Sequence, residues 1–198
     1  SKIFITYGEH DLTDNIIHFV LARLPDAPPG TKGISLFLVP KFLPDGKHND
    51  LRAHSIEHKM GIHASPTCTM VYGDKGGATL YLVGEENKGM LAMFTMMNRA
   101  RLAVGLQGVG IAETATQQAI AYANERKQGA GGTIAHYPDV KRMLLTMRAL
   151  TQAARTICYA TAVALDRSHR AKSEAERKAA HERASLLTPI AKAFSTDI

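Results

Sequence analysis

The sequence predicts an α+β protein in which an antiparallel β-sandwich or barrel precedes most of an up-down four-helix bundle. Two observations predict this fold class. Residues 1–84 contain short runs rich in β-branched and aromatic residues, bounded by Gly, Pro, Asp and Asn. Residues 85–198 contain long segments with the periodicity of amphipathic helices. We therefore divide the chain into a β domain, residues 1–84, and a helical bundle, residues 85–198.

The predicted strands of the β domain form separate runs between turn-forming residues. They occupy residues 2–8, 15–24, 33–40, 68–73 and 78–84. Residues 25–33 and 41–52 are predicted to be loops, since both contain Pro, Gly and Asp in turn-forming order. Parallel strands need a crossover helix, and no helical segment separates these runs, so the sheets are expected to be antiparallel.

Three helices are predicted for the bundle. The first covers residues 85–128, the second begins near Pro138, and the third runs from Glu174 to the end. The expected buried stripe of the second helix is Val140, Met143, Leu144, Met147, Leu150, Ala154, Ile157, Ala160 and Ala164. The residues of the third helix expected to face the core are Leu186, Leu187, Ile190 and Ala191. Wide apolar faces on three helices leave room for a fourth.

The two ends of the chain suggest an interior segment of a longer protein. The sequence begins inside a strand-like run at Lys2 and stops within a helical pattern at Ile198, without a capping glycine. We therefore expect an N-terminally truncated β domain and a C-terminally truncated bundle.

Composition indicates a globular protein and disfavours two function classes. The chain has 198 residues, 45% of them hydrophobic, and a formal net charge of +6. Basic residues in 166–183 alternate with acidic ones, as on a solvated helix face, so nucleic-acid binding is not expected. No apolar run reaches the ~18 residues of a membrane helix and no signal peptide is recognisable, so we expect a cytoplasmic protein. Cys68 and Cys158 are expected to be buried free thiols.

Glycines and arginines distinguish the first helix. Gly105, Gly108 and Gly110 lack the spacing of a dinucleotide-binding loop and do not follow a strand. Glycine inside a helix costs about 1 kcal/mol against alanine, which indicates either close helix packing or contact with a flat ligand. Arg99 and Arg101 point to different sides of the helix. The methionines beside them form either an adaptable core or a pocket for a flexible apolar chain.

No metal site and no hydrolytic triad is expected. His54 and His58 are four residues apart, yet no nearby carboxylate or thiol completes a ligand set. The segment Gly8–Asp11 and Ser65 offer nucleophilic or acid-base groups, but no nucleophile elbow surrounds them. Turn capping is therefore their expected role.

The order and spacing of six segments resemble the acyl-CoA dehydrogenase family, in particular a large-subunit subgroup that includes 3-methylmercaptopropionyl-CoA dehydrogenases. The segments are KIFITYGEHD, GTKGISLFLVPKFLPDG, EHKMGIHASPT, LVGEENKGM, NRARLAVGLQGVGIAETATQQAIAYANERKQG and IAKAFSTDI. The resemblance covers nearly the whole chain. It implies a middle β domain followed by a four-helix bundle, with an N-terminal helical domain missing from this chain.

The resemblance also implies an FAD-dependent enzyme. Such an enzyme removes a proton from the α carbon of an acyl-CoA thioester and transfers a hydride from the β carbon to the flavin, which leaves a trans-2-enoyl-CoA. FAD would lie between the β domain and the bundle and reach a neighbouring subunit, so a homodimer or homotetramer is expected. Electron-transfer flavoprotein is the expected electron acceptor.

Particular residues match the functional positions of the family. Phe4, Ile5 and Thr6 match its Trp-Ile-Thr segment beside the isoalloxazine, with phenylalanine in place of tryptophan. Ser65 matches a serine that contacts CoA, and Arg101 matches the arginine beside the CoA and acyl site.

Two further matches concern the cofactor and the catalytic base. Arg126 and Gln128 match the motif whose arginine binds the FAD pyrophosphate of the partner subunit, although Gln128-Gly129 replaces its usual phenylalanine-glycine. The family places its catalytic glutamate either directly before the arginine matched by Arg101 or in a later helix. Ala100 occupies the first position, so no catalytic residue is expected in this chain and the base is expected beyond Ile198.

Two alternatives remain open. An acyl-CoA oxidase-like flavoenzyme would produce peroxide instead of passing electrons to a flavoprotein. A non-catalytic relative would use the helical bundle as an interaction surface and would carry no flavin.

Overall fold

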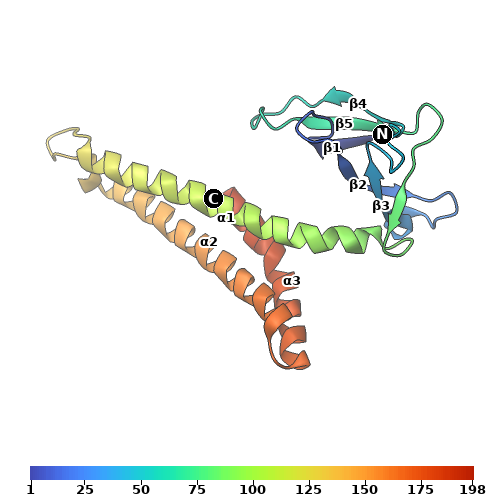
Figure 1. Ribbon diagram of the computed structural model, residues 1–198. Helices are drawn as coiled ribbons and strands as arrows, with labels where there is room; N and C mark the ends of the chain where they lie inside the picture. Colours follow the sequence, from blue (N-terminus) through green and yellow to red (C-terminus); the bar gives the residue numbers. More distant parts are fainter. The chain divides into compact units, whose positions relative to one another are not determined.

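The computed structural model describes residues 1–198, apart from the side chain of Phe4. Over these residues the strands come first and three long helices follow (Figure 1). The elements are β1 (Lys2–Thr6), β2 (Ile17–Arg23), η1 (Gly30–Gly33), β3 (Ile34–Pro40), β4 (Leu51–Ile56), β5 (Thr67–Tyr72), β6 (Tyr81–Val83), α1 (Gly89–Glu125), η2 (Ile134–His136), α2 (Pro138–Arg170) and α3 (Glu174–Asp197). This order confirms the predicted α+β fold class.

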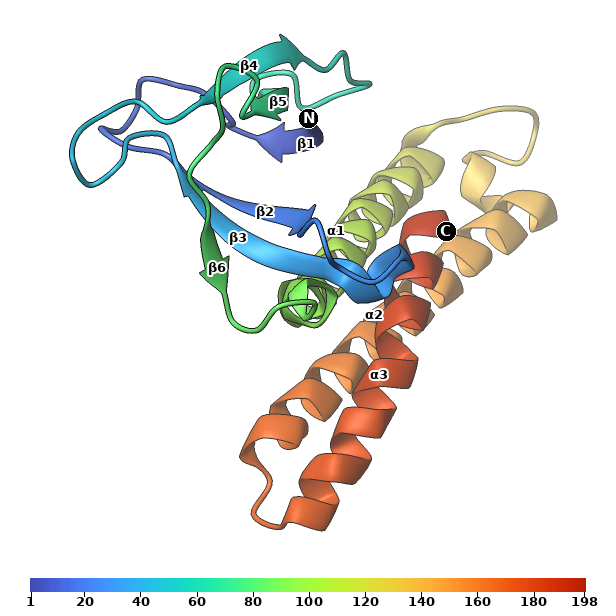
Figure 2. The same cartoon turned by 90° about the vertical axis from the view of Figure 1, so that its right-hand side faces the viewer.

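The described strands form two three-stranded antiparallel sheets, which Figure 2 shows as separate layers. The first sheet has the order β1-β5-β4, and the second has the order β2-β3-β6. β2 and β3 pair along their whole length, from Ile17 opposite Pro40 to Arg23 opposite Ile34. The antiparallel sheets expected from the spacing of strands and turns are therefore present.

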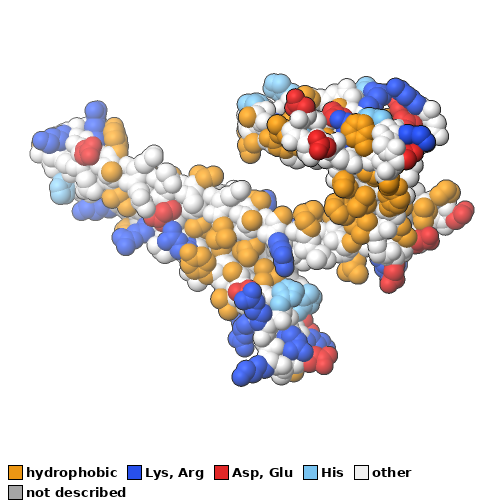
Figure 3. All heavy atoms as spheres, in the orientation of Figure 1, with side chains coloured by type: hydrophobic (Ala, Val, Ile, Leu, Met, Phe, Trp, Pro, Cys, Tyr) orange, Lys and Arg blue, Asp and Glu red, His pale blue; other side chains and the backbone are white. Residues whose placement is uncertain are grey.

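The core of the β layers follows from the alternation of buried and more exposed side chains along β2 and β3. Successive side chains in a strand point to opposite faces, so alternate residues reach the core. The buried cluster consists of Val20, Phe37, Val39, Leu51, Cys68 and Met70, and it draws on both sheets. On the opposite face of the second sheet, Ile17, Phe19 and Tyr81 are exposed, and Figure 3 shows hydrophobic side chains gathered over these strands.

Strand β4 was not predicted. Its first two residues fall in the predicted loop 41–52, and no strand was predicted between that loop and residue 68. Leu51–Ile56 pairs with β5 at the edge of the first sheet. Its sequence, LRAHSI, buries only Leu51, and its other side chains are half-buried or exposed. An edge strand contacts one neighbour and keeps a weak hydrophobic pattern, so pairing with β5 decides its conformation.

The contact pattern divides the chain into two compact units, Ser1–Thr95 and Met96–Ile198. The boundary lies inside α1, because the first residues of this helix pack on the strands. A Cβ added at Gly89 would lie 2.7 Å from the backbone nitrogen of Leu36, so the helix start approaches β3 closely. The domain boundary placed at residue 84 stays a prediction.

The glycines of α1 have different surroundings within the second unit. A Cβ on Gly108 would lie 2.7 Å from the carbonyl carbon of Ser195 and closer still to its oxygen. One on Gly105 would lie 3.3 Å from the carbonyl oxygen of Ala191. At Gly110 no described atom lies within 4 Å of such a Cβ. Close approach of α3 therefore explains two of these glycines without a ligand.

Helices α2 and α3 pack through small side chains, not through all of the large ones that were predicted to face the core. The buried residues of the two helices are Thr151, Ala154, Cys158, Thr161, Ala164, Ala180, Ala184, Thr188, Ala191 and Ser195. The predicted core positions Leu186 and Ile190 are 65% and 44% exposed, and Met143 and Leu150 are exposed as well. Short side chains let the helices approach closely, so the bulky residues lie beside the contact and not within it.

The ends of the helices follow their sequence signals. Pro138 is the first residue of α2, as predicted. Ser173 caps α3, because its Oγ accepts from the backbone N–H of Glu176 at 3.2 Å while the Glu176 side chain accepts from the Ser173 N–H. Both signals are local, so they act before tertiary packing does.

Two further features of the chain concern its thiols and its longest helices. Cys68 and Cys158 are free and buried, which confirms the prediction for both. None of the described helices combines the length and the apolar character needed to cross a membrane.

Candidate functional site

The end of β1 meets the loop before β5 at one end of the first sheet. In the β1–β5 register, Thr6 lies opposite Thr67. The backbone N–H of Tyr7 continues this pairing by donating to the carbonyl of Pro66 at 2.9 Å. Ser65 therefore lies beside the end of β1, although the two segments are far apart in sequence.

Three predicted site residues come together here. Thr6 is exposed and Ser65 is half-buried, and neither hydroxyl has a hydrogen-bond partner among the residues that the structure describes. Ile5 is half-buried and packs against the core between the sheets. The side chain of Phe4 lies outside the described part of the chain, so its predicted place beside a flavin stays a prediction.

The segment Gly8–Asp11, which follows β1, stabilises its own turn. The His10 N–H donates to Glu9 Oε1 at 3.2 Å, and the Leu12 N–H donates to His10 Nδ1 at 3.1 Å. Lys41 forms an ion pair with Glu9 at 2.5 Å. These contacts confirm turn capping as the role of Glu9 and His10.

A buried histidine, which sequence reasoning missed, connects the two sheets. His18 on β2 is 6% exposed, with Nε2 3.0 Å from the Gly8 carbonyl oxygen and Nδ1 2.9 Å from the Tyr72 hydroxyl on β5. A carbonyl only accepts, so Nε2 carries the proton and Nδ1 accepts from Tyr72. Burial lowers the pKa of His18 and raises the pKa of Tyr72 to about 12, so both groups are neutral at pH 7. The available sequence signal was a histidine at an inward position of an apolar strand.

The end of α1 carries Arg126 and Gln128 on a tight loop. The Ile134 N–H donates to the Arg126 carbonyl at 2.8 Å, and the Gln128 N–H donates to the Gly132 carbonyl at 3.1 Å. The Tyr137 hydroxyl donates to the Gln128 carbonyl at 2.7 Å and closes the loop. The side chains of Arg126 and Gln128 are exposed, and no partner for them occurs among the described residues. Such a guanidinium suits a phosphate group.

Arg101 lies within α1, and Arg126 is the first residue after this helix ends at Glu125. At 1.5 Å per residue, about 37 Å of chain, nearly all of it helical, separates them. Arg101 is half-buried, whereas the neighbouring Arg99 is exposed. The structure therefore does not place Arg101 and Arg126 where one group of a ligand could contact both side chains.

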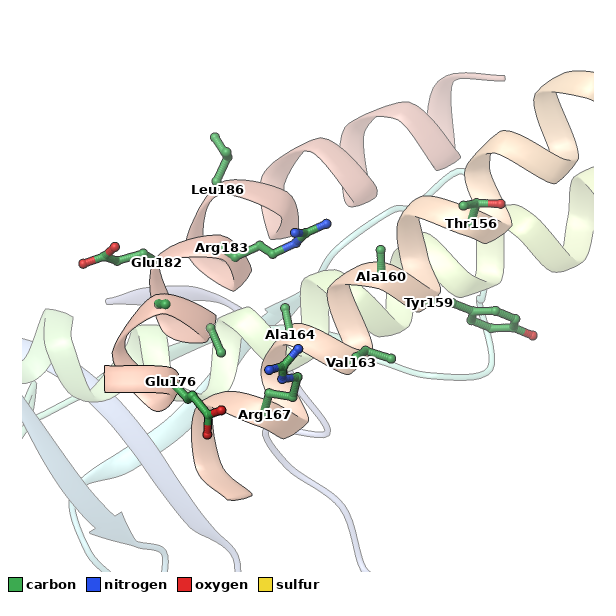
Figure 4. A pocket seen from close by; sticks show the side chains of 12 residues that line it. Thr156, Tyr159, Ala160, Val163, Ala164, Arg167, Glu176, Glu182, Arg183 and Leu186 are labelled. Atoms are coloured by element: carbon green, nitrogen blue, oxygen red, sulfur yellow. The ribbon is translucent and has the colours of Figure 1, made fainter. Parts of the chain in front are cut away.

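A groove of about 1070 Å³ lies on the hairpin formed by α2 and α3 (Figure 4). Its lining includes Tyr159 and Val163 from α2 and Leu186 from α3, together with Arg167 and Arg183. Of the predicted site residues that the structure describes, none lines this groove. The groove therefore shares no lining residue with the meeting point of β1 and Ser65.

Comparison with known proteins identifies the family of this chain. The family model for the acyl-CoA dehydrogenase C-terminal domain matches residues 87–195. The whole chain aligns at 50% identity with 3-methylmercaptopropionyl-CoA dehydrogenase of Ruegeria pomeroyi. The chain spans about 35% of the length of that relative.

Solved structures share the fold as well. Butyryl-CoA dehydrogenase of Megasphaera elsdenii matches with a TM-score of 0.69 and 27% identity, over 99% of this chain and 45% of that one. An acyl-CoA dehydrogenase from Bacillus anthracis, complexed with FAD, matches with a TM-score of 0.63 and 28% identity, over 82% and 28% of the respective chains. Since the family model covers more than half of the residues and the identity extends over the whole sequence, the chain belongs to the acyl-CoA dehydrogenase family.

Proposed function

We propose that the protein carrying this chain is an FAD-dependent acyl-CoA dehydrogenase that converts an acyl-CoA thioester into a trans-2-enoyl-CoA. The observation that carries the proposal is the meeting of Thr6, at the end of β1, with the segment that contains Ser65. The first is the proposed flavin contact and the second the proposed CoA contact. Holding substrate and cofactor next to each other is the main task of the protein in such a reaction.

The described residues suit FAD at two places. At the end of β1, the exposed Thr6 hydroxyl is free to hydrogen-bond to a flavin ring atom, while Ile5 packs against the core and anchors this end of the strand. After α1, the Arg126 guanidinium and the Gln128 amide suit a pyrophosphate, because arginine forms charge-assisted hydrogen bonds with phosphate oxygens. When bound, FAD supplies the hydride acceptor of the reaction.

The separation of the arginines supports an oligomer. Because about 37 Å of chain lies between Arg101 and Arg126, no single flavin ring, phosphate or thioester group is expected to contact both. We propose that Arg101 serves the substrate of its own subunit and that Arg126 serves the FAD of a second copy. A homodimer or homotetramer would satisfy this requirement.

The proton acceptor is proposed to lie elsewhere in the protein. Removing the α proton requires a carboxylate positioned close to the α carbon. Ala100, directly before Arg101, carries no ionisable group. We therefore propose that this position of α1 contributes no base and that another segment of the bundle supplies it.

The test uses the natural full-length protein, purified without added flavin. It should contain bound FAD, and anaerobic addition of a suitable acyl-CoA should bleach the visible absorbance of the flavin. The substrate panel should include 3-methylmercaptopropionyl-CoA and butyryl-CoA, since relatives carry these names. Protein without flavin, or flavin that no acyl-CoA reduces, would contradict the proposal.

The electron acceptor is tested in the same material. We propose electron-transfer flavoprotein, so reduction of that protein should accompany turnover. Stoichiometric peroxide formation in air, without reduction of the flavoprotein, would identify an oxidase instead.

A further inference from the structure

The loop between β4 and β5, residues 57–66, contains an unusual backbone conformation. Ile62 has a φ of 53°, in the left-handed region that β-branched residues rarely adopt. Its side chain is 80% exposed, so burial of apolar surface does not hold it there. A conformation of this kind persists only where its surroundings enforce it.

One lysine supplies two of the hydrogen bonds that hold this turn. Lys59 Nζ donates to the Ile62 carbonyl at 2.9 Å and to the Ser65 carbonyl at 2.7 Å. The Ser65 N–H donates to the Ile62 carbonyl at 3.2 Å, which closes the turn. By donating to both carbonyl groups, a single ammonium links the two ends of the turn. Hydrogen bonds from a charged donor are stronger than those from a neutral donor, so these two bonds hold the turn firmly.

The base of the loop is held separately by the first sheet. The Glu57 N–H donates to the Thr67 carbonyl at 2.7 Å, and Thr69 Oγ1 donates to Glu57 Oε1 at 2.6 Å. These contacts would survive the loss of Lys59. The effect of removing its ammonium should therefore be confined to residues 62–66.

We propose that Lys59 is a positioning residue, which holds the turn Ile62–Ser65 and thereby places the Ser65 hydroxyl beside the end of β1. The inference rests on the proposed acyl-CoA dehydrogenase function, in which Ser65 contacts CoA. Lys59 acts through the backbone, because its ammonium is bound to two carbonyl groups. Its loss should weaken substrate binding and leave the chemical step nearly unchanged.

The test compares three variants of the natural full-length protein. Lys59→Met removes the ammonium but keeps an unbranched chain, and Lys59→Arg keeps a positive donor. Lys75→Met, at an exposed lysine after β5, is the matched control. For each variant, hydrogen exchange is measured at the Ser65 amide, which closes the turn, and KM and kcat are measured with the best acyl-CoA.

The expected results separate positioning from a general loss of structure. In Lys59→Met, exchange of the Ser65 amide, which donates to the Ile62 carbonyl, should accelerate at least about tenfold, because local opening of the turn becomes easier. KM should rise about tenfold, equivalent to about 1.4 kcal/mol, with kcat within about twofold of the wild type. Lys59→Arg should recover part of both effects, and Lys75→Met should match the wild type.

Several outcomes would overturn the inference. Unchanged exchange in Lys59→Met would show that the ammonium does not hold the turn. Faster exchange with an unchanged KM, or an equal loss in kcat, would show that the turn does not place a substrate contact. If no acyl-CoA reduces the wild-type flavin, the proposed function fails, and the exchange measurement alone then decides whether Lys59 holds the turn.

Discussion

Replacing Gly108 with alanine tests whether the glycines of α1 exist for helix packing. The added Cβ would lie 2.7 Å from the carbonyl carbon of Ser195 on α3 and closer still to the oxygen. The obstacle is backbone, which cannot rotate away as a flexible side chain can. Either α1 or α3 must therefore shift, and the small-residue contacts around Ala191 must loosen with it.

Alanine at Gly108 and alanine at Gly110 are expected to change the free energy of unfolding in opposite directions. Overpacking a well-packed core typically costs about 1–3 kcal/mol, and a backbone obstacle places Gly108→Ala at the upper end of this range. Alanine recovers about 1 kcal/mol of helix propensity, so the net loss is about 2 kcal/mol. Gly110→Ala meets no described atom within 4 Å and should gain up to about 1 kcal/mol. The two variants should therefore differ by about 3 kcal/mol.

Urea unfolding followed by circular dichroism measures this difference. The midpoint of Gly108→Ala should fall and that of Gly110→Ala should rise, with similar slopes for both variants. Gly105→Ala, where the nearest carbonyl oxygen is 3.3 Å away, should lie between them. Equal midpoints for Gly108→Ala and Gly110→Ala would refute the packing explanation and favour contact with a ligand as the reason for these glycines.

Two further predictions concern the cofactor and the β layers. Arg126→Ala should weaken FAD binding about tenfold or more, because a charge-assisted hydrogen bond is lost, while the KM for the acyl-CoA changes little. The flavin retained after dialysis measures this effect, and Arg170→Ala, at another exposed arginine, is the control. Unchanged flavin occupancy in Arg126→Ala would contradict the assignment. Burial lowers the pKa of folded His18, so the unfolded chain binds this proton first and stability falls as pH drops below about 6.5. Between pH 7.5 and 5.5, the urea midpoint of His18→Gln should change less with pH than that of the wild type. The midpoint of His169→Gln, at an exposed histidine, should change with pH as the wild type does. If the midpoints of His18→Gln and the wild type change equally with pH, His18 does not cause the loss of stability.

The sequence was sufficient for most secondary structure because the relevant signals are local. Pro138 marks the start of α2, and runs of β-branched and aromatic residues between turn-forming residues mark β2 and β3. β4 lacks such a signal, since only Leu51 of its residues is buried. Its conformation depends on hydrogen bonds to β5, and a single-sequence pattern does not contain those bonds.

Helix packing was predicted less well than helix position. A three-four repeat of large apolar residues predicts which side of a helix is hydrophobic, but it does not state which residues meet the neighbour. In α3 the contact is made by residues such as Ala184, Thr188 and Ala191, whereas Leu186 and Ile190 are exposed. How closely two helices approach depends on both surfaces together, so one helix pattern is not enough.

By itself, the sequence determined the family, the order of strands and helices, and the residue types that suit a flavin and a CoA thioester. The tertiary structure decided which of them meet: Thr6 lies beside the Ser65 segment, Arg126 follows the end of α1 about 37 Å from Arg101, and Gly108 faces α3. The physical reason is range. Periodicity and capping act between residues a few positions apart, whereas a site is formed by contacts between distant segments, whose geometry depends on how whole sheets and helices pack.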